Sequence, residues 1–128
     1  MNNAGRKALK KIFDDFTMDE EAIVEAGKDE ESRSTLAGTL SDMSSGVQAI
    51  LDEEQEKFDN MPEGLQGGSK GDELQEKIDS LQSAVDALEN AQSKVENDWS
   101  ADVDFDAEDW AGNIKSDIDE AEEAATSV

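Results

Sequence analysis

The chain has 128 residues, 34 of them acidic and 11 basic, and a net charge of −23, so it is long enough for one domain with a modest core. It contains no His, Cys or Tyr, which removes the common proton shuttles, thiol nucleophiles and imidazole or thiolate metal sites. A field of this sign repels nucleic acid and anionic membranes and attracts basic surfaces. We therefore expect a single non-enzymatic domain over residues 1–128, without a cofactor, whose partner is a basic protein.

The first predicted element is an amphipathic helix over residues 3–16. Its apolar side chains recur at helical spacing, at Ala8, Leu9, Ile12, Phe13 and Phe16. Its other side is basic, with Arg6, Lys7, Lys10 and Lys11. Two roles remain open: the apolar side caps the core while the bases pair with the acidic body, or the helix serves docking or self-association. Lysines interrupt the apolar positions and no apolar run is long enough to span a membrane, so we expect neither a signal peptide nor a membrane segment, and a cytoplasmic location.

A short helix is predicted next, over residues 18–26. Thr17 and Glu20 have the spacing of a capping box, which satisfies the free N–H groups at the start of a helix. Gly27 is suited to end this helix, because glycine is the preferred residue just past a helix end.

Two long helices are predicted over residues 32–60 and 72–98. The first carries a heptad seam at Leu36, Leu40, Met43, Val47 and Ile50, which is interrupted at Glu54 and resumes at Phe58. The second repeats the seam at Leu74, Ile78, Leu81, Val85, Leu88, Val95 and Trp99, with Gln92 as its polar position. Between them, Pro62 and a run of glycines predict a flexible connection, and Asp72 suits the positive N-terminal end of the second helix.

The two seams predict an antiparallel, coiled-coil-like helical hairpin. Facing residues of such a hairpin are equidistant from the centre of its loop, and Gln66 lies at the middle of the glycine-rich segment. At 1.5 Å per residue, arms of about 27 residues reach roughly 40 Å. One hairpin leaves apolar area exposed, so we expect an all-α fold in which short flanking helices complete a small bundle, or a homodimer through the hairpin. The expected pairs are Phe58 with Leu74, Leu51 with Leu81, Val47 with Val85 and, offset by one residue, Met43 with Leu88.

Residues 98–128 form an acidic C-terminal segment. Trp110, Ile114 and Ile118 stand at i, i+4 and i+8 and predict a final amphipathic helix with an acidic outer face. Before it, aspartates alternate with apolar residues in the stretch DVDFD, residues 102–106. If this stretch is extended, successive aspartates lie about 6.7 Å apart on one side, while Val103 and Phe105 point inward. Such a charged row is suited to lysines and arginines that otherwise bind phosphates.

The same three aspartates occupy the first ligand positions of an EF-hand calcium loop. That loop also requires glycine at its sixth position and a bidentate glutamate at its twelfth. Ala107 and Asn113 stand there instead. We therefore expect no selective metal site, and divalent-ion sensing is the weakest of the alternatives.

The candidate partner-binding surface combines this acidic segment with its aromatic side chains. Duplex DNA carries one charge per about 1.7 Å, so a net charge of −23 equals that of roughly 39 Å of duplex, close to the expected length of the hairpin. Aromatic side chains are typical apolar anchors of interfaces, and the candidates are Trp99, Phe105 and Trp110. The candidate acidic residues are Asp98, Asp102, Asp104, Asp106, Glu108, Asp109, Asp117, Asp119, Glu120, Glu122 and Glu123.

Residues 52–92 resemble a group of small acidic proteins encoded by bacteriophages. The shared pattern is a glutamate-rich helix end, then D-N-[MIL]-P-E-x-L-Q, a Gly/Ser-rich turn and a helix rich in Glu, Ala and Leu. It is matched by Asp59, Asn60, Met61, Pro62, Glu63, Leu65 and Gln66. The resemblance implies a viral origin. The group has no established activity, so it assigns no site residue.

Two functions remain open. The first is inhibition of a basic host nuclease or defence complex, of the restriction or CRISPR type, by nucleic-acid mimicry and without direct binding to nucleic acid. The second is a coiled-coil scaffolding or replication accessory protein of a phage, in which the apolar seams and the basic N-terminal helix make the contacts and the acids give solubility. Replacing Asp102, Asp104 and Asp106 with asparagine separates the two, because target binding collapses only in the first.

Overall fold

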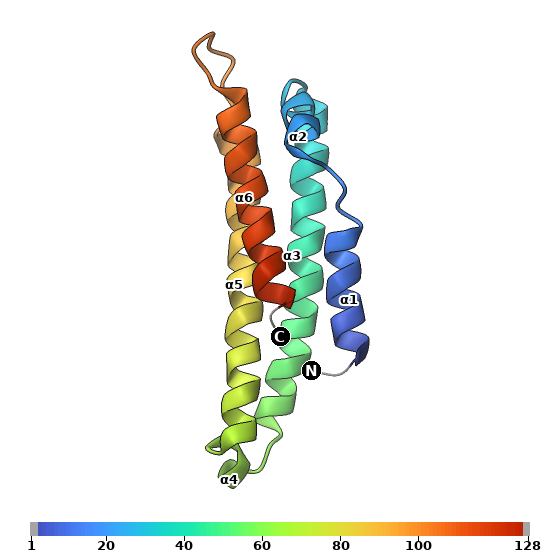
Figure 1. Cartoon of the computed structure of the whole chain (residues 1–128), viewed down its shortest axis with the longest axis vertical. Helices are drawn as coiled ribbons and strands as arrows, with labels where there is room; N and C mark the ends of the chain where they lie inside the picture. Colours follow the sequence, from blue (N-terminus) through green and yellow to red (C-terminus); the bar gives the residue numbers. More distant parts are fainter. Residues whose placement is uncertain (1–2, 127–128) are drawn as a thin grey trace.

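The computed structural model describes residues 3–126, and all regular structure within that range is helical. The helices are α1 (Asn3–Asp14), α2 (Glu20–Gly27), α3 (Glu30–Asp59), α4 (Glu63–Gln66), α5 (Ser69–Asn97) and α6 (Ala107–Thr126). α3 and α5 are the long arms of an antiparallel hairpin, and α4 lies in the turn that joins them (Figure 1). The all-α hairpin fold that the heptad seams predict is confirmed.

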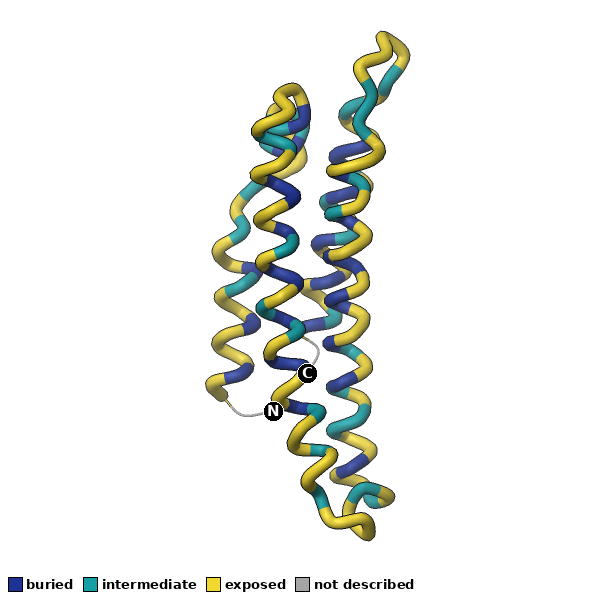
Figure 2. The backbone as a smooth tube through the Cα atoms, turned by 180° about the vertical axis from the view of Figure 1, so that it is seen from behind, coloured by how far each residue is buried: buried dark blue, intermediate teal, exposed yellow. Residues whose placement is uncertain are grey.

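The predicted seams form the core of the hairpin. Buried positions recur along the inner sides of both arms, whereas the outer sides are exposed (Figure 2). Phe58, Leu74 and Trp99, at the ends of the seams, are only partly buried. The fully buried seam residues are Leu36, Leu40, Met43, Val47 and Ile50 on α3, and Ile78, Leu81, Val85, Leu88 and Val95 on α5.

The flanking helices cover one side of the hairpin. α6 runs back along α5, whereas α1 and α2 lie against α3 and also contact α6 (Figure 1). Leu9, Ile23 and Ile114 bring α1, α2 and α6 into the same core as the two seams. Towards α4, the two arms continue without a flanking helix. One chain therefore covers most of its own apolar surface, which is the small bundle expected from the sequence.

The N-caps of α2 and α3 are aspartates, and Thr17 caps neither helix. The Asp19 carboxylate accepts a hydrogen bond from the backbone N–H of Ala22 at 2.8 Å, so α2 begins at the residue after it. The Asp29 carboxylate does the same for the backbone N–H of Ser32 at 3.2 Å, and α3 begins two residues earlier than predicted. A carboxylate is the better cap because its charge also suits the positive end of the helix. The capping box predicted at Thr17 is wrong.

The connection between the arms is more ordered than its glycine content predicts. It contains α4, and α5 begins at Ser69, before Asp72, which lies in the first turn of that helix as predicted. The Gln66 side-chain amide closes the turn by donating to the Phe58 carbonyl at 2.8 Å. The backbone of Gln66 also packs closely against Gly71, where a Cβ would collide with it. A compact helical turn thus replaces the flexible connection.

The basic residues of α1 face solvent. Its apolar side packs against the core as predicted, except for Ala8, which is exposed. Within residues 3–126, the ion pair of this helix is internal, between Lys10 and Asp14 at 3.7 Å. The core-capping role of α1 is confirmed, whereas pairing of its bases with the acidic body is not seen among the described residues. The exposed bases are Arg6, Lys7, Lys10 and Lys11.

Candidate protein-binding surface

Trp99, Phe105 and Trp110, the predicted apolar anchors, form one aromatic cluster at the junction of α5 and α6. The ring centroid of Trp99 lies 4.9 Å from that of each of the other two, in edge-to-face geometry. Trp110 is 4% exposed, and its Nε1 donates a hydrogen bond to the Lys94 carbonyl at 2.9 Å. Trp99 and Phe105 are partly exposed. Trp110 is therefore a core residue, and only the other two rings present an edge to a partner.

The aromatic cluster also holds α2 and the start of α3. A Cβ built on Gly27 would lie 2.6 Å from a Trp99 ring carbon and 2.7 Å from a Trp110 ring carbon. The Arg33 guanidinium lies 5.4 Å from the centroid of the Trp99 ring and donates to the Gly27 carbonyl. Gly27 thus permits close packing, and it does not end α2 in a left-handed conformation, since no residue within 3–126 has a positive φ.

The loop between α5 and α6 is not extended, so the prediction of a straight row of aspartates is wrong. The backbone N–H of Phe105 donates to the Asp102 carbonyl at 3.1 Å, so the chain turns there. Val103 is 100% exposed at the tip of this turn and does not point inward, whereas Phe105 does pack against the core. Asp106 accepts a hydrogen bond from the backbone N–H of Asp109 at 3.0 Å and caps the start of α6. A turn followed by a helix start therefore replaces the extended stretch that the alternation of aspartates and apolar residues predicts.

The remaining acids of the predicted surface fall into two groups. Asp117 is partly buried and its Oδ2 lies 2.6 Å from the Lys94 ammonium, so this carboxylate joins α6 to α5. Asp119 is exposed, but it pairs with Lys115 at 2.5 Å. The acids that stay exposed without an ion pair among the described residues are Asp98, Asp102, Asp104, Glu108, Asp109, Glu120, Glu122 and Glu123.

Sequence reasoning missed a second set of carboxylates, on the long arms. At five places a glutamine side-chain amide donates to a carboxylate four residues later, at 2.9 to 3.2 Å. We call these carboxylates the hairpin acidic face. The pairs are Gln48–Asp52 and Gln55–Asp59 on α3, and Gln75–Asp79, Gln82–Asp86 and Gln92–Glu96 on α5.

The hairpin acidic face lies on the side of the hairpin away from the flanking helices. Residues seven or fourteen apart lie on the same side of such a helix. Gln48 and Gln55 therefore lie on the same side of α3 as Ser34, and Asp52 and Asp59 lie on the same side as Gly38. Ser34, Gly38 and Glu96 line one open groove between the arms. Gln75 and Gln82 precede Glu96 on the same heptad row of α5. The carboxylates therefore form rows along both arms on one side of the molecule.

The lysines of the two arms occupy other positions. Lys57 follows the buried Ile50 by seven residues, and Lys77 precedes the buried Ala84 by seven. Lys94, on the α6 side, pairs with a carboxylate of that helix. Lys57 lies 3.0 Å from the carboxylate of Glu54, a residue 2% exposed at the interruption of the first seam. Lys57, Lys77 and Lys94 thus lie on the core side of the arms, whereas Arg33 of α3 lines the groove together with Glu96, at the α2 end of the hairpin acidic face.

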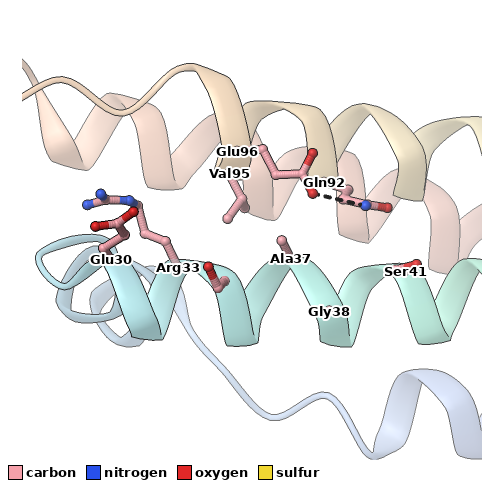
Figure 3. Close-up of a pocket in the computed structure, with 9 residues that line it drawn as sticks. Glu30, Arg33, Ala37, Gly38, Ser41, Gln92, Val95 and Glu96 are labelled. Atoms are coloured by element: carbon pink, nitrogen blue, oxygen red, sulfur yellow. Dashed lines mark hydrogen bonds between the residues drawn. The ribbon is translucent and has the colours of Figure 1, made fainter.

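The groove between the arms has a volume of about 530 Å³ and lies at the end of the hairpin nearest α2 (Figure 3). Its α3 wall has small residues from Ser34 to Ser41 and the charged Glu30 and Arg33 at the end nearest α2, and a Cβ on Gly38 would meet nothing within 4 Å. Ala37 and Val95, which are equidistant from Gln66, both line the groove. Other lining residues include Ser34, Ser41, Gln92 and Glu96.

Within residues 3–126, no group of three or more carboxylates is placed to hold a metal ion. None of the described helices is both long and apolar enough to cross a membrane. Comparisons of the chain with protein-family models, curated proteins and solved structures find no match, so the resemblance to phage proteins stays a prediction.

Proposed function

We propose that the chain is a non-enzymatic inhibitor that binds a basic, nucleic-acid-handling protein and competes with its nucleic acid. The observation that supports this most is the hairpin acidic face, where five carboxylates are held by glutamines. Acids that serve solubility alone do not need a fixed orientation. Oriented charges that are not neutralised are what a basic nucleic-acid site recognises in a phosphate backbone.

The choice of glutamine matters physically. A lysine four residues from a carboxylate stabilises a helix by about 0.2–0.5 kcal/mol, but it also neutralises the charge. The chain uses lysine in this way elsewhere, at Lys115–Asp119 and, three residues apart, at Lys28–Glu25. A glutamine amide orients the carboxylate and leaves its full charge to a partner. Side chains fixed before binding also lose less entropy, roughly 0.5–1.5 kcal/mol for each.

The carboxylates recur along both arms. Asp52 and Asp59 are seven residues apart on α3, and so are Asp79 and Asp86 on α5. Seven residues at 1.5 Å span about 10.5 Å, so each arm carries a row of negative charges along its axis. A basic channel that binds an elongated polyanion can therefore contact charges of both arms.

The acidic segment after α5 extends the proposed surface. Asp98, Asp102 and Asp104 are exposed directly beyond the α5 end of the hairpin acidic face, and Trp99 and Phe105 add partly exposed rings. Three of the residues predicted from sequence have internal roles instead. Asp106 caps α6, Asp117 pairs with Lys94, and Trp110 is buried, so the proposal does not depend on them.

The scaffolding alternative has no specific observation in its favour. A coiled-coil scaffold needs an apolar seam that other chains can reach. Leu40, Val47, Leu81 and Leu88 are each 0% exposed, so their seams are already occupied within one chain.

The predicted phage origin narrows the target class. Nucleases and defence complexes of a bacterial host hold nucleic acid in positively charged channels, as RNA-guided effectors do. A rigid acidic hairpin of roughly 40 Å is suited to such a channel. We therefore propose a restriction or CRISPR-type effector as the target.

The test begins with capture of a binding protein from bacterial lysate at ~0.15 M salt and its release at high salt or by duplex DNA. Affinity for that protein is then measured with two variants that each lose five negative charges. The face variant carries Asp52→Asn, Asp59→Asn, Asp79→Asn, Asp86→Asn and Glu96→Gln. The matched control neutralises five exposed acids at other positions, Asp15, Glu21, Asp42, Glu53 and Glu73.

We expect the face variant to weaken binding at least about fivefold, because each exposed charge pair contributes ~0.2–1 kcal/mol, and the control to have a much smaller effect. A third variant, with Asp102, Asp104 and Asp106 changed to asparagine, measures the share of the loop. Equal losses in the face variant and the control would show that net charge alone acts and would end the mimicry proposal. A tight complex of the wild-type chain with DNA itself at ~0.15 M salt would end it as well.

A further inference from the structure

α1 and the C-terminal half of α6 carry opposite charges on neighbouring surfaces. The two helices are in contact and run in opposite directions, so the N-terminal half of α1 lies near the end of α6 (Figure 1). The exposed bases of α1 are the basic stripe, Arg6, Lys7, Lys10 and Lys11. The exposed acids of α6 at this level are the acidic stripe, Asp119, Glu122 and Glu123, of which Asp119 is paired with Lys115.

The acidic stripe lies on the side of α6 that faces α1 and α2. A Cβ on Gly112 would lie 3.3 Å from the carboxylate of Glu20, so this side of α6 meets α2 near its start. Asp119 follows Gly112 by seven residues and therefore continues the same side towards the end of the helix. Because α1 precedes α2 and lies beyond it along α3, this side continues alongside α1. One face of the molecule thus carries a positive and a negative stripe side by side.

Arg6, Lys7, Glu122 and Glu123 are placed against the dipoles of their own helices. The first turn of α1 contains no acid, and bases follow it, although the N-terminal end of a helix favours negative charge. The last turn of α6 contains no base, and Glu122 and Glu123 stand near it, although that end favours positive charge. Lys11, in contrast, lies in the last turn of α1, where a base suits the dipole. Within residues 3–126 the two stripes form no ion pair with each other. Helix ends and side chains instead add up to one strongly polar face.

We propose that this face, formed by the basic stripe of α1 and the acidic stripe of α6, is where a second copy of the chain binds to form a two-fold symmetric dimer. A two-fold contact requires a surface that is complementary to itself. The two-fold axis runs along the boundary between the two stripes. Rotation by 180° about it places each basic stripe on the acidic stripe of the other copy. The hairpin acidic face lies on the other side and stays free for a target, so the dimer is independent of the proposed function.

The dimer has a distinctive dependence on salt. Each copy has a net charge of −23, which opposes association wherever charges act over long distances. At ~0.01 M salt the Debye length is about 30 Å and the whole-molecule repulsion dominates, whereas at ~0.15 M it is about 8 Å and the local stripes decide. At ~1 M salt it is about 3 Å and the stripes themselves are screened. Dimerisation should therefore be strongest at intermediate salt.

The test is analytical ultracentrifugation of the full chain at these three salt concentrations, over a wide range of protein concentrations. One variant carries Arg6→Glu and Lys7→Glu, and another carries Glu122→Lys and Glu123→Lys. Both changes agree with the helix dipoles, so folding should be retained, and far-UV circular dichroism checks this. We expect each variant to be monomeric alone. The second variant is informative because it loses dimerisation although its net negative charge falls by four units.

Charge reversal provides the matched control. An equimolar mixture of the two variants should form a heterodimer, because both of its contacts are again between opposite charges. A chain with all four substitutions has the wild-type net charge and should dimerise with itself. The face variant, in which the hairpin acidic face is neutralised, should dimerise at least as well as wild type. A wild-type chain that stays monomeric at every salt concentration would overturn the proposal, and so would variants that still dimerise, a mixture that does not associate, or larger open-ended assemblies.

Discussion

Gly27→Ala is the substitution whose effect the structure defines most closely. The added methyl would lie 2.6 Å, 2.7 Å and 2.9 Å from ring carbons of Trp99 and Trp110. Favourable contacts between carbon atoms lie at about 3.5–4.0 Å, so α2 or the two indoles must shift by close to 1 Å. The indoles are held by each other and by the Nε1 hydrogen bond of Trp110, so they have little freedom to move.

The expected cost of Gly27→Ala is ~1–3 kcal/mol of unfolding free energy, the usual range for an added methyl group in a packed core. Alanine recovers up to about 1 kcal/mol as the better helix former, and less at this position because Gly27 is the last residue of α2. A net loss of about 1–2 kcal/mol should lower the midpoint of thermal unfolding by several degrees, since each kcal/mol shifts it by roughly 2–8 °C in domains of this size range. Urea unfolding measures the change, followed by circular dichroism and by the fluorescence of the two tryptophans.

Gly38→Ala is the matched control. Gly38 is exposed within α3, and a Cβ there meets nothing within 4 Å. The same change should therefore raise the unfolding free energy by up to ~1 kcal/mol. If Gly27→Ala is as stable as wild type, or if Gly38→Ala is the more damaging of the two, the close packing of α2 on the aromatic cluster is refuted.

Three further substitutions test the internal contacts. Trp110→Phe should cost about 1–2 kcal/mol, because it removes a buried hydrogen-bond donor and part of a buried ring, and urea unfolding that is unchanged would contradict this. Lys57→Ala should cost ~1 kcal/mol or more, since it removes the ammonium beside the buried carboxylate of Glu54, whereas Lys70→Ala, at an exposed helix start, should stay within about 0.5 kcal/mol in the same titration. Val103→Ser should also change stability by less than ~0.5 kcal/mol, and a larger loss in thermal unfolding would mean that this side chain is buried after all.

The heptad pattern was sufficient to predict the antiparallel hairpin, because leucine and valine seams with the same repeat can bury each other when the two arms pack side by side. Helix ends were less predictable. Thr17 and Asp19 are both acceptable caps in the sequence, and the choice of Asp19 depends on where Ile23 must lie to be buried.

The candidate surface was predicted only in part. The acids after α5 are conspicuous in the sequence, but Asp106 and Asp117 serve the fold, and the aspartates of the loop do not form a row. The hairpin acidic face could have been found from the recurring Gln-x-x-x-Asp spacing, for example Gln48 with Asp52. That signal is inconspicuous because such spacing is common in solvent-exposed helices.

The sequence by itself determined the helices, the seams that join the two arms and the net charge, because each of these depends on local spacing or on composition alone. Only the tertiary structure decided which charged side chains remain available to a binding partner. Whether an acid faces a lysine, a glutamine, a helix end or water depends on how α6 and α1 pack around the hairpin. For the same reason Trp110, conspicuous in the sequence as a surface anchor, is buried once α6 folds back on α5.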